Sequence, residues 1–232
     1  MPTIIAFETS SETASVSLMK KSGEIETRYS SGVATHSQKI LPMISNLLTE
    51  AGIGVADCDA IAFGCGPGSF TGVRTSCGVA QGLAFGAALP LVSVVSLLAM
   101  AQTCWENHHA ADVLAILDAR MKEVYWAQYR YDENGCWQTV TAPCITSPEA
   151  VTPIGVPHAC GNGLLAYANA FSSLAILAKH PNIIPDSTAV ASLAEIAYRQ
   201  GDIITAHEAC PLYLRNKVAY TTEERRTMKK GG

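Results

Sequence analysis

The chain has 232 residues, of which 48% are hydrophobic and 16% charged, a composition typical of a globular protein with a sizeable buried core. Its formal net charge of -4 argues against a chain that binds nucleic acid or an anionic membrane by itself, because such binding depends on clustered lysine and arginine. The eight cysteines include no Cys-x-x-Cys pair, so we expect reduced, buried thiols and not a disulfide or zinc framework.

The first elements are three predicted strands. Residues 4–7 form an apolar run with no basic leader before it, which predicts no secretory signal and a cytoplasmic location. Residues 14–18 and 25–29 are the second and third strands, the first two forming a hairpin. A helical pattern follows over residues 36–51, in which Pro42 should bend the helix or mark a late start.

A glycine-rich turn comes next, between a predicted strand at residues 60–63 and a predicted helix over residues 71–88. Its sequence is Gly66-Pro67-Gly68-Ser69-Phe70-Thr71-Gly72. Free amides at a helix start favour an anion, so the turn could hold a phosphate. The spacing fits neither the dinucleotide fingerprint nor the phosphate loop of nucleotide hydrolases, so a purely structural turn is an equal alternative.

The helix after this turn carries Gly78, Gly82 and Gly86 on one side. Each glycine costs about 1 kcal/mol relative to alanine inside a helix, so close approach of another backbone should compensate. We prefer a protein interface as that partner, and tight packing inside the domain is the alternative.

No charged residue occurs between Arg74 and Glu106, which raises the question of a membrane span. Pro90 and the repeated glycines interrupt the segment, so a buried helix, a strand at residues 91–95 and a second helix are expected instead. We therefore expect no membrane partner.

A second unit begins near residue 112 and repeats the pattern of the first. Residues 114–118 and 124–128 match residues 4–8 and 14–18, since each pair is an apolar strand ending in a carboxylate, a turn and a second strand. The order of elements predicts an α/β protein with a unit at residues 1–108, a second at 109–209 and a C-terminal segment at 210–232 that packs back on the first unit. Facing halves would bring Glu8 and Asp118 to a shared cleft, unless each carboxylate only caps its turn.

The rest of the second unit is less patterned. A turn at residues 161–163 precedes a predicted helix over 164–171, and a further helix is predicted over 189–200. The charged tail at residues 221–232 should be frayed.

Catalytic groupings are absent from the sequence pattern. His108 and His109 are adjacent and diverge in a helix, no His-x-x-x-His pair occurs, and we expect both to be solvated loop residues. Ser69 lacks the Gly-x-Ser-x-Gly context of a hydrolase nucleophile. We therefore expect no catalytic residue and no metal ligand.

Several motifs together resemble the bacterial TsaB (YeaZ) family. They are Phe7-Glu8-Thr9-Ser10, His36-Ser37-Gln38 with Ile40-Leu41-Pro42, Gly66 to Arg74, Ala80-Gln81-Gly82-Leu83-Ala84, Asp118-Ala119-Arg120 with Glu123-Val124-Tyr125, and Pro211-Leu212-Tyr213-Leu214-Arg215. The resemblance implies duplicated ribonuclease H-like halves of the actin-like, Hsp70-like ATPase (ASKHA) fold. It also implies a role in making threonylcarbamoyladenosine next to the anticodon of tRNA.

Within that family the resemblance implies a non-catalytic scaffold beside the catalytic TsaD and the ATPase TsaE. The chain would need no cofactor of its own, ATP would bind the partner subunits, tRNA would be met only through the complex, and a homodimer could form in isolation. In TsaD-like proteins two histidines bind a metal where this chain has Ser96 and Met100, and neither suits a hard catalytic metal. The glycine usual after the first acidic residue of such ATPases is also missing after Glu8 and after Asp118.

Two sets of site residues follow. The expected partner interface, on the two helices that pair in the family, comprises His36, Ile40, Met43, Ile44, Leu47, Arg74, Gly78, Gln81, Gly82 and Phe85. The candidate anion or nucleotide site comprises Glu8, Thr9, Gly66, Gly68, Ser69, Thr71 and Asp118. Two other functions stay open, namely a stand-alone metallopeptidase or ATP-dependent enzyme of the same fold, and a module that senses a nucleotide without hydrolysis.

Overall fold

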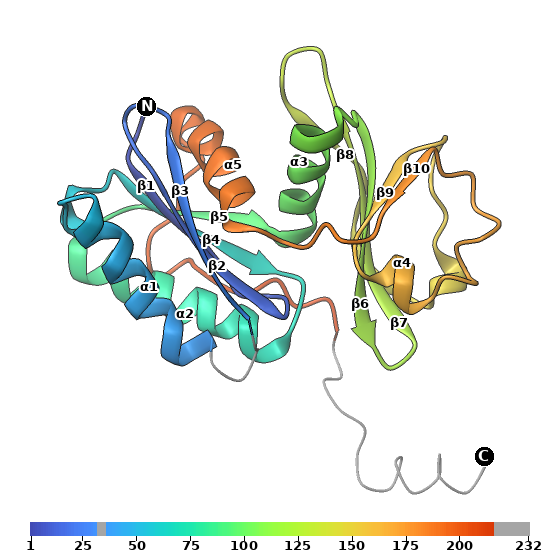
Figure 1. The fold of residues 1–232 in the computed structure, drawn as a ribbon, viewed down its shortest axis with the longest axis horizontal. Helices are drawn as coiled ribbons and strands as arrows, with labels where there is room; N and C mark the ends of the chain where they lie inside the picture. Colours follow the sequence, from blue (N-terminus) through green and yellow to red (C-terminus); the bar gives the residue numbers. More distant parts are fainter. Residues whose placement is uncertain (32–35, 216–232) are drawn as a thin grey trace, which may run out of the picture.

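The computed structural model describes residues 1–31 and 36–215 and contains two five-stranded sheets. Two helices, α3 (Ser96–His108) and α5 (Ser187–Gln200), lie between the sheets, as Figure 1 shows. All eight cysteines are free; five are buried, two are half-buried and Cys210 is exposed.

The first sheet has the strand order β3-β2-β1-β4-β5. Its strands are β1 (Ile4–Glu8), β2 (Thr13–Met19), β3 (Ile25–Ser31), β4 (Ala60–Gly66) and β5 (Leu91–Val95). The strands β1, β2 and β3 form an antiparallel meander, whereas β4 and β5 run parallel to β1. All five predicted strands of the first unit are confirmed, each with the predicted residues or slightly longer.

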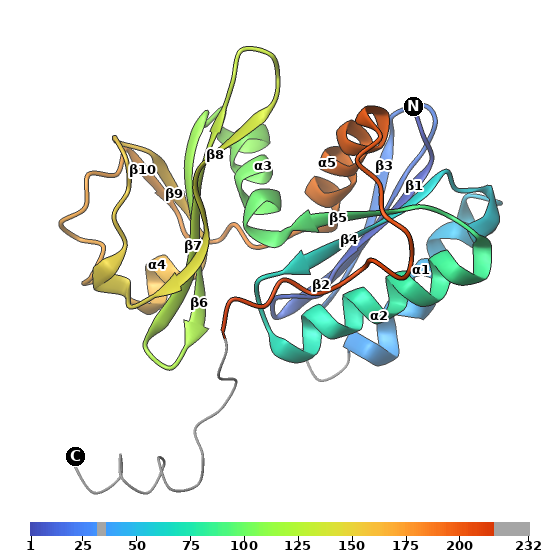
Figure 2. The same cartoon turned by 180° about the vertical axis from the view of Figure 1, so that it is seen from behind.

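Alternate residues of each strand point to opposite faces of the first sheet, and helices cover both faces. Ile5 and Phe7 pack under α1 (His36–Glu50) and α2 (Phe70–Ala87). Ile4 and Ala6 pack against α3 and α5 on the other face, and Figure 2 shows this layering from behind. Helix α1 runs through Pro42, so the predicted late start is wrong.

The second sheet repeats the first. Its strands are β6 (Asp112–Arg120), β7 (Glu123–Tyr131), β8 (Trp137–Thr146), β9 (His158–Cys160) and β10 (Ala178–His180). The order β8-β7-β6-β9-β10 has the same antiparallel meander and the same two parallel strands as the first sheet. This identity of topology confirms the predicted duplication and the α/β class.

Several elements of the second half differ from expectation. The strands β8, β9 and β10 were not predicted, and the helix predicted over residues 164–171 is wrong beyond Ala166, where α4 (Gly163–Ala166) ends. Turns follow α4, and in them the Tyr167 hydroxyl donates to Asp118 and Phe171 enters the core. Short 3-10 turns lie at Val55–Asp57 and Pro148–Ala150.

The packing crosses the predicted division at residue 109. Helix α5 follows the second sheet in the chain but packs on the first, where the Ser187 amide donates to the Ser15 hydroxyl at 2.9 Å. The C-terminal segment also lies on the first half, since the Leu212 amide donates to the Cys65 carbonyl at 2.8 Å. The unit boundaries stay a prediction, and the predicted frayed tail lies outside the described residues.

Candidate functional site

The glycine stripe of α2 faces outward. A Cβ built on Gly78, Gly82 or Gly86 would meet no atom of the described residues within 4 Å. The alternative of tight packing inside the domain is therefore wrong for these three glycines. Their cost in helix stability has no compensation within the part of the chain that the structure describes.

Exposed apolar side chains lie beside this stripe. Phe85 is 74% exposed on α2 and Leu41 is 49% exposed on α1. Between the two helices a shallow groove of about 400 Å³ is lined by Leu41, Ile44, Ser45, Leu48, Thr49, Ile53, Gly54, Val55 and Leu83. The outer surface of α1 and α2 thus combines glycines with exposed apolar side chains, and exposed apolar patches mark sites of interaction.

The predicted interface residues divide into two groups. On α1, the side chains of His36, Ile40 and Leu47 are at most 1% exposed and pack inside the chain, so the prediction that they contact a partner is wrong. Their apolar stripe covers the first sheet. Ile44 is 2% exposed but lines the groove, so its contact with a partner stays a prediction. Met43 on α1 is half-buried.

On α2 the predicted residues remain accessible. Gly78, Gly82 and Phe85 are exposed, whereas Gln81 donates from its amide to the Ala209 carbonyl at 3.0 Å. Arg74 is exposed, with its guanidinium 3.7 Å above the Phe70 ring and its Nε donating to the Tyr213 hydroxyl at 2.7 Å. The accessible part of the predicted interface is therefore the outer face of α2.

The glycine turn before α2 is occupied by the chain itself. A Cβ on Gly68 would overlap Ser10, and one on Gly72 would overlap the Thr9 carbonyl. The Ser69 amide donates to the Ser10 carbonyl at 2.7 Å, and the Thr9 hydroxyl donates to the Gly72 carbonyl at 2.7 Å. These contacts favour the structural interpretation, because the turn locks the β1–β2 connection onto the start of α2.

Gly66, Thr71 and Ser69, which were also predicted to belong to the anion site, each have a local structural role or lie at the surface. Gly66 has a φ of +101°, a left-handed conformation that suits glycine. Thr71 is exposed in the first turn of α2, and its carbonyl accepts from Thr75. Ser69 caps α2, with its hydroxyl accepting from the Gly72 amide at 3.4 Å.

Glu8 is fully buried and does not reach the cleft. Its carboxylate accepts from the Ser96 hydroxyl and from the Ser10 amide, each at 2.6 Å. Burial raises the pKa of Glu8 above its ordinary value, and the hydrogen bonds from Ser96 and Ser10 oppose that shift only in part. The predicted meeting of Glu8 and Asp118 is therefore wrong, since only Asp118 lines the cleft.

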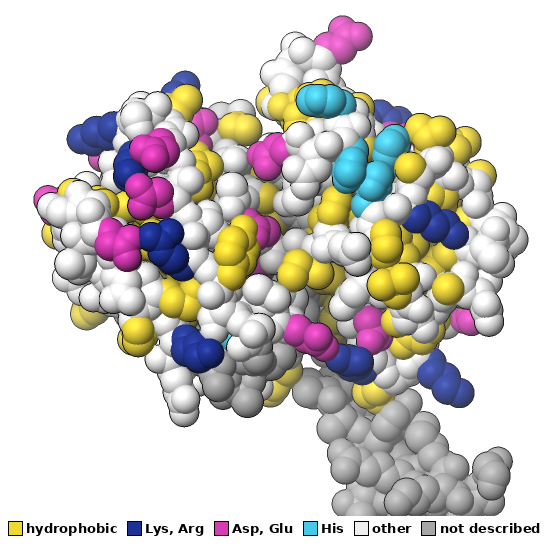
Figure 3. All heavy atoms as spheres, viewed as in Figure 1, with side chains coloured by type: hydrophobic (Ala, Val, Ile, Leu, Met, Phe, Trp, Pro, Cys, Tyr) yellow, Lys and Arg dark blue, Asp and Glu magenta, His cyan; other side chains and the backbone are white. Residues whose placement is uncertain are grey.

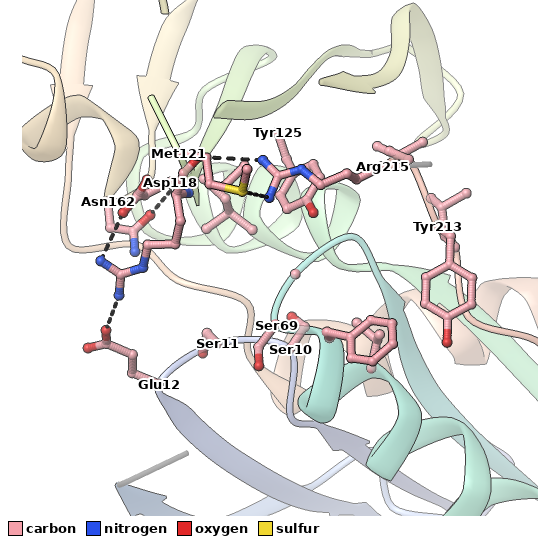
Figure 4. A pocket seen from close by; sticks show the side chains of 18 residues that line it. Ser10, Ser11, Glu12, Ser69, Asp118, Met121, Tyr125, Asn162, Tyr213 and Arg215 are labelled. Atoms are coloured by element: carbon pink, nitrogen blue, oxygen red, sulfur yellow. Dashed lines mark hydrogen bonds and ion pairs between the residues drawn. The ribbon is translucent and has the colours of Figure 1, made fainter. Parts of the chain in front are cut away.

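The cleft between the halves has a volume of about 380 Å³. Glu12 and Asp118 approach it from opposite sides, as Figure 4 shows, and Arg120 joins them with contacts of 3.0 Å and 3.2 Å. Arg215 lies on the same rim, paired with Glu123. The sequence contained these arginines only as parts of motifs, and nothing in its pattern indicated that they line one cleft.

The positions of the TsaD metal ligands do not fit a metal here. Ser96 is buried and donates to Glu8, and Met100 has no exposed surface. A hydroxyl committed to a carboxylate and a buried thioether do not form a donor set for a hard cation.

Comparisons with known proteins bear on the whole chain. Residues 23–227 match the TsaD family model, described as tRNA N6-adenosine threonylcarbamoyltransferase. The chain is 37% identical over 223 residues to the tRNA threonylcarbamoyladenosine biosynthesis protein TsaB of Escherichia coli K12, covering 94% of this chain and 96% of that protein. The TsaB of Haemophilus influenzae is 39% identical over 228 residues, covering 94% and 95%.

The chain belongs to the TsaB (YeaZ) family. YeaZ from Pseudomonas aeruginosa superposes with a TM-score of 0.85 at 36% identity, covering 92% of this chain and all of that one. The TsaB family resemblance of the sequence and the predicted fold are thereby confirmed. Among the described residues, no helix combines the length and apolar composition that a membrane crossing needs.

One further prediction fails within this TsaB fold. His108 is the last residue of α3 and not a loop residue, although it is exposed as predicted, and its ring stacks on that of His180 with centroids 3.8 Å apart. His109 follows the helix and is exposed, as predicted. The four-residue spacing of Cys104 and His108 places both on one side of a helix. This spacing was the one signal in the sequence that a thiol and an imidazole gather near His180.

Proposed function

We propose that the chain serves tRNA threonylcarbamoyladenosine biosynthesis as a non-catalytic scaffold that pairs with TsaD. The observation that carries the proposal is the outward-facing glycine stripe of α2, flanked by exposed Phe85, in a chain similar to proteins named TsaB. Glycines let two helix backbones approach closely, and such contact compensates their cost in helix stability. Pairing over this face also supplies the surface that we propose helps to recruit TsaE.

The first test is the substitution Gly82→Leu. The glycine has open space around it, so the isolated chain should fold, whereas the new side chain would collide with a helix packed on the stripe. Light scattering on a sizing column should show wild type and TsaD as one species with the mass of a heterodimer. We expect Gly82→Leu to weaken pairing at least about fivefold, since overpacking a contact costs about 1–3 kcal/mol and about 1.4 kcal/mol is tenfold in affinity.

The control is Gln200→Leu, which places the same leucine side chain at an exposed position of α5, away from α2. It should pair like wild type. Native affinity of Gly82→Leu for TsaD would refute the assigned face. A wild-type chain that is monomeric both alone and with TsaD would refute the scaffold itself.

The remaining parts of the proposal concern nucleotide, tRNA and location. The glycine turn is filled by Ser10, and Ser96 and Met100 replace metal-binding histidines, so we propose that nucleotide binding and chemistry belong to the partners. The chain would meet tRNA only within the complex, form a homodimer through the same face when alone, and act in the cytoplasm. Calorimetric titration with ADP should give no binding heat, and ATP turnover by the isolated chain would instead support an enzyme.

A further inference from the structure

A thiol and two imidazoles lie close together near the C-terminal end of α3, the end opposite Ser96. They are Cys104 of α3, His158 of β9 and His180 of β10, and their ligand atoms all lie within 4.8 Å of one another. The His158 Nδ1 and His180 Nε2 atoms are 3.0 Å apart. The cluster is brought together from three separate elements.

The register of the second sheet explains this meeting. In β9 and β10, alternate residues share a face, and His180 is the partner of Cys160 across the parallel pair. His158, Cys160 and His180 therefore point to the same face, the one that α3 covers. Cys104 lies on the side of α3 packed against that face.

The burial and charge around these three side chains are suited to a bound cation. Cys104 has no exposed surface, whereas His158 and His180 are half-buried, so the thiol lies inside and the imidazoles open to the surface. Figure 3 shows histidine side chains gathered between the end of α3 and the strands β9 and β10. His108 stacks on His180, which places three imidazoles together on that surface, with no carboxylate in the cluster to balance a positive charge. Neutral imidazoles are the form that ligates a metal.

We propose that Cys104, His158 and His180 bind one Zn²⁺ ion. A thiolate with imidazole nitrogens is a donor set that zinc prefers, with a fourth, tetrahedral position left on the solvent side for water. The site lies two helical turns beyond Ser96, so it is separate from the place of the TsaD metal. The ion would fasten the end of α3 to β9 and β10, since its ligands come from all three elements.

The test uses the full chain without an affinity tag, dialysed against chelator and then loaded with Zn²⁺ or with Co²⁺ as a spectroscopic probe. We expect one Zn²⁺ retained per chain after a sizing column and a higher Tm on loading, because binding to the folded state stabilises it. Co²⁺ should give the near-ultraviolet absorption of a thiolate ligand. His158→Gln and His180→Gln should each weaken binding at least about tenfold, in line with loss of a metal ligand or its support.

Two controls separate this site from adventitious binding. Cys210→Ser removes an exposed thiol and His207→Gln an exposed imidazole, and both variants should bind like wild type. Cys104→Ser tests the thiolate, and its fold is checked by circular dichroism without metal. Failure of wild type to retain Zn²⁺, equal retention by His180→Gln, or loss in Cys210→Ser would each overturn the proposal.

Discussion

Gly72→Ala is expected to destabilise the protein by about 3 kcal/mol or more, at the upper end of overpacking effects. A Cβ at this position would overlap the Thr9 carbonyl and crowd the Ser10 backbone. Neither group can move freely, because the Thr9 hydroxyl donates to Gly72 and the Ser10 carbonyl accepts from Ser69. Urea denaturation followed by circular dichroism measures the change in the free energy of unfolding.

Gly82→Ala is the matched control on the same helix. Its Cβ would enter open space, so the isolated chain should gain about 0.5–1 kcal/mol from better helix propensity. The same substitution thus has opposite signs ten residues apart. Equal losses at both positions would contradict the assignment of the two helix faces.

Glu8→Ala is expected to cost about 3 kcal/mol, which combines a cavity with the loss of hydrogen-bond partners. The Ser96 hydroxyl and the Ser10 amide both donate to the buried carboxylate and would lose their acceptor. Glu8→Gln should be far milder, because its amide oxygen can accept from Ser10 while its NH₂ donates to the Ser96 oxygen. Both losses are measured by denaturation at neutral pH.

The same pair of variants tests the raised pKa of Glu8. Since burial raises this pKa in the folded state, the folded protein holds a proton more tightly than the unfolded chain. The associated stability is present below the unfolded pKa near 4.5 and is lost as pH rises through the folded pKa. Wild type should therefore lose stability over that window at up to about 1.4 kcal/mol per pH unit, and Glu8→Gln should lose less. A parallel pH profile for the two proteins would contradict this linkage.

The sequence predicted the first half of the fold well, because its elements are long and regular. Buried strands such as β4 and β5 are continuous apolar runs, and α2 follows a glycine turn that gives it a clear start. In the second half, β9 and β10 have three residues each, too few to display a period of two. Only the pairing of β9 with β6 and of β10 with β9 identifies them as strands.

The candidate site was predicted less well, for a related reason. The apolar stripe of α1 showed that Ile40 and Ile44 would be buried, but periodicity does not say against what, and the first sheet covers them. The exposed glycines of α2 were identified because their cost in a helix is local and independent of tertiary contacts. The meeting of Cys104 with His158 and His180 depends on register between distant segments, which the sequence does not display.

The placement of α5 determines how the molecule can unfold. The chain leaves the first sheet at Val95, builds the second sheet, and returns with α5 to cover Ile4, Ala6 and Ala62 of the first. A fragment ending before Ser187 would expose that apolar face to water, and one beginning after α3 would lack the cover of Val113 and Ala115. Neither half is autonomous, so the two halves should unfold in a single cooperative transition, and a nascent chain cannot complete its first half until α5 has left the ribosome.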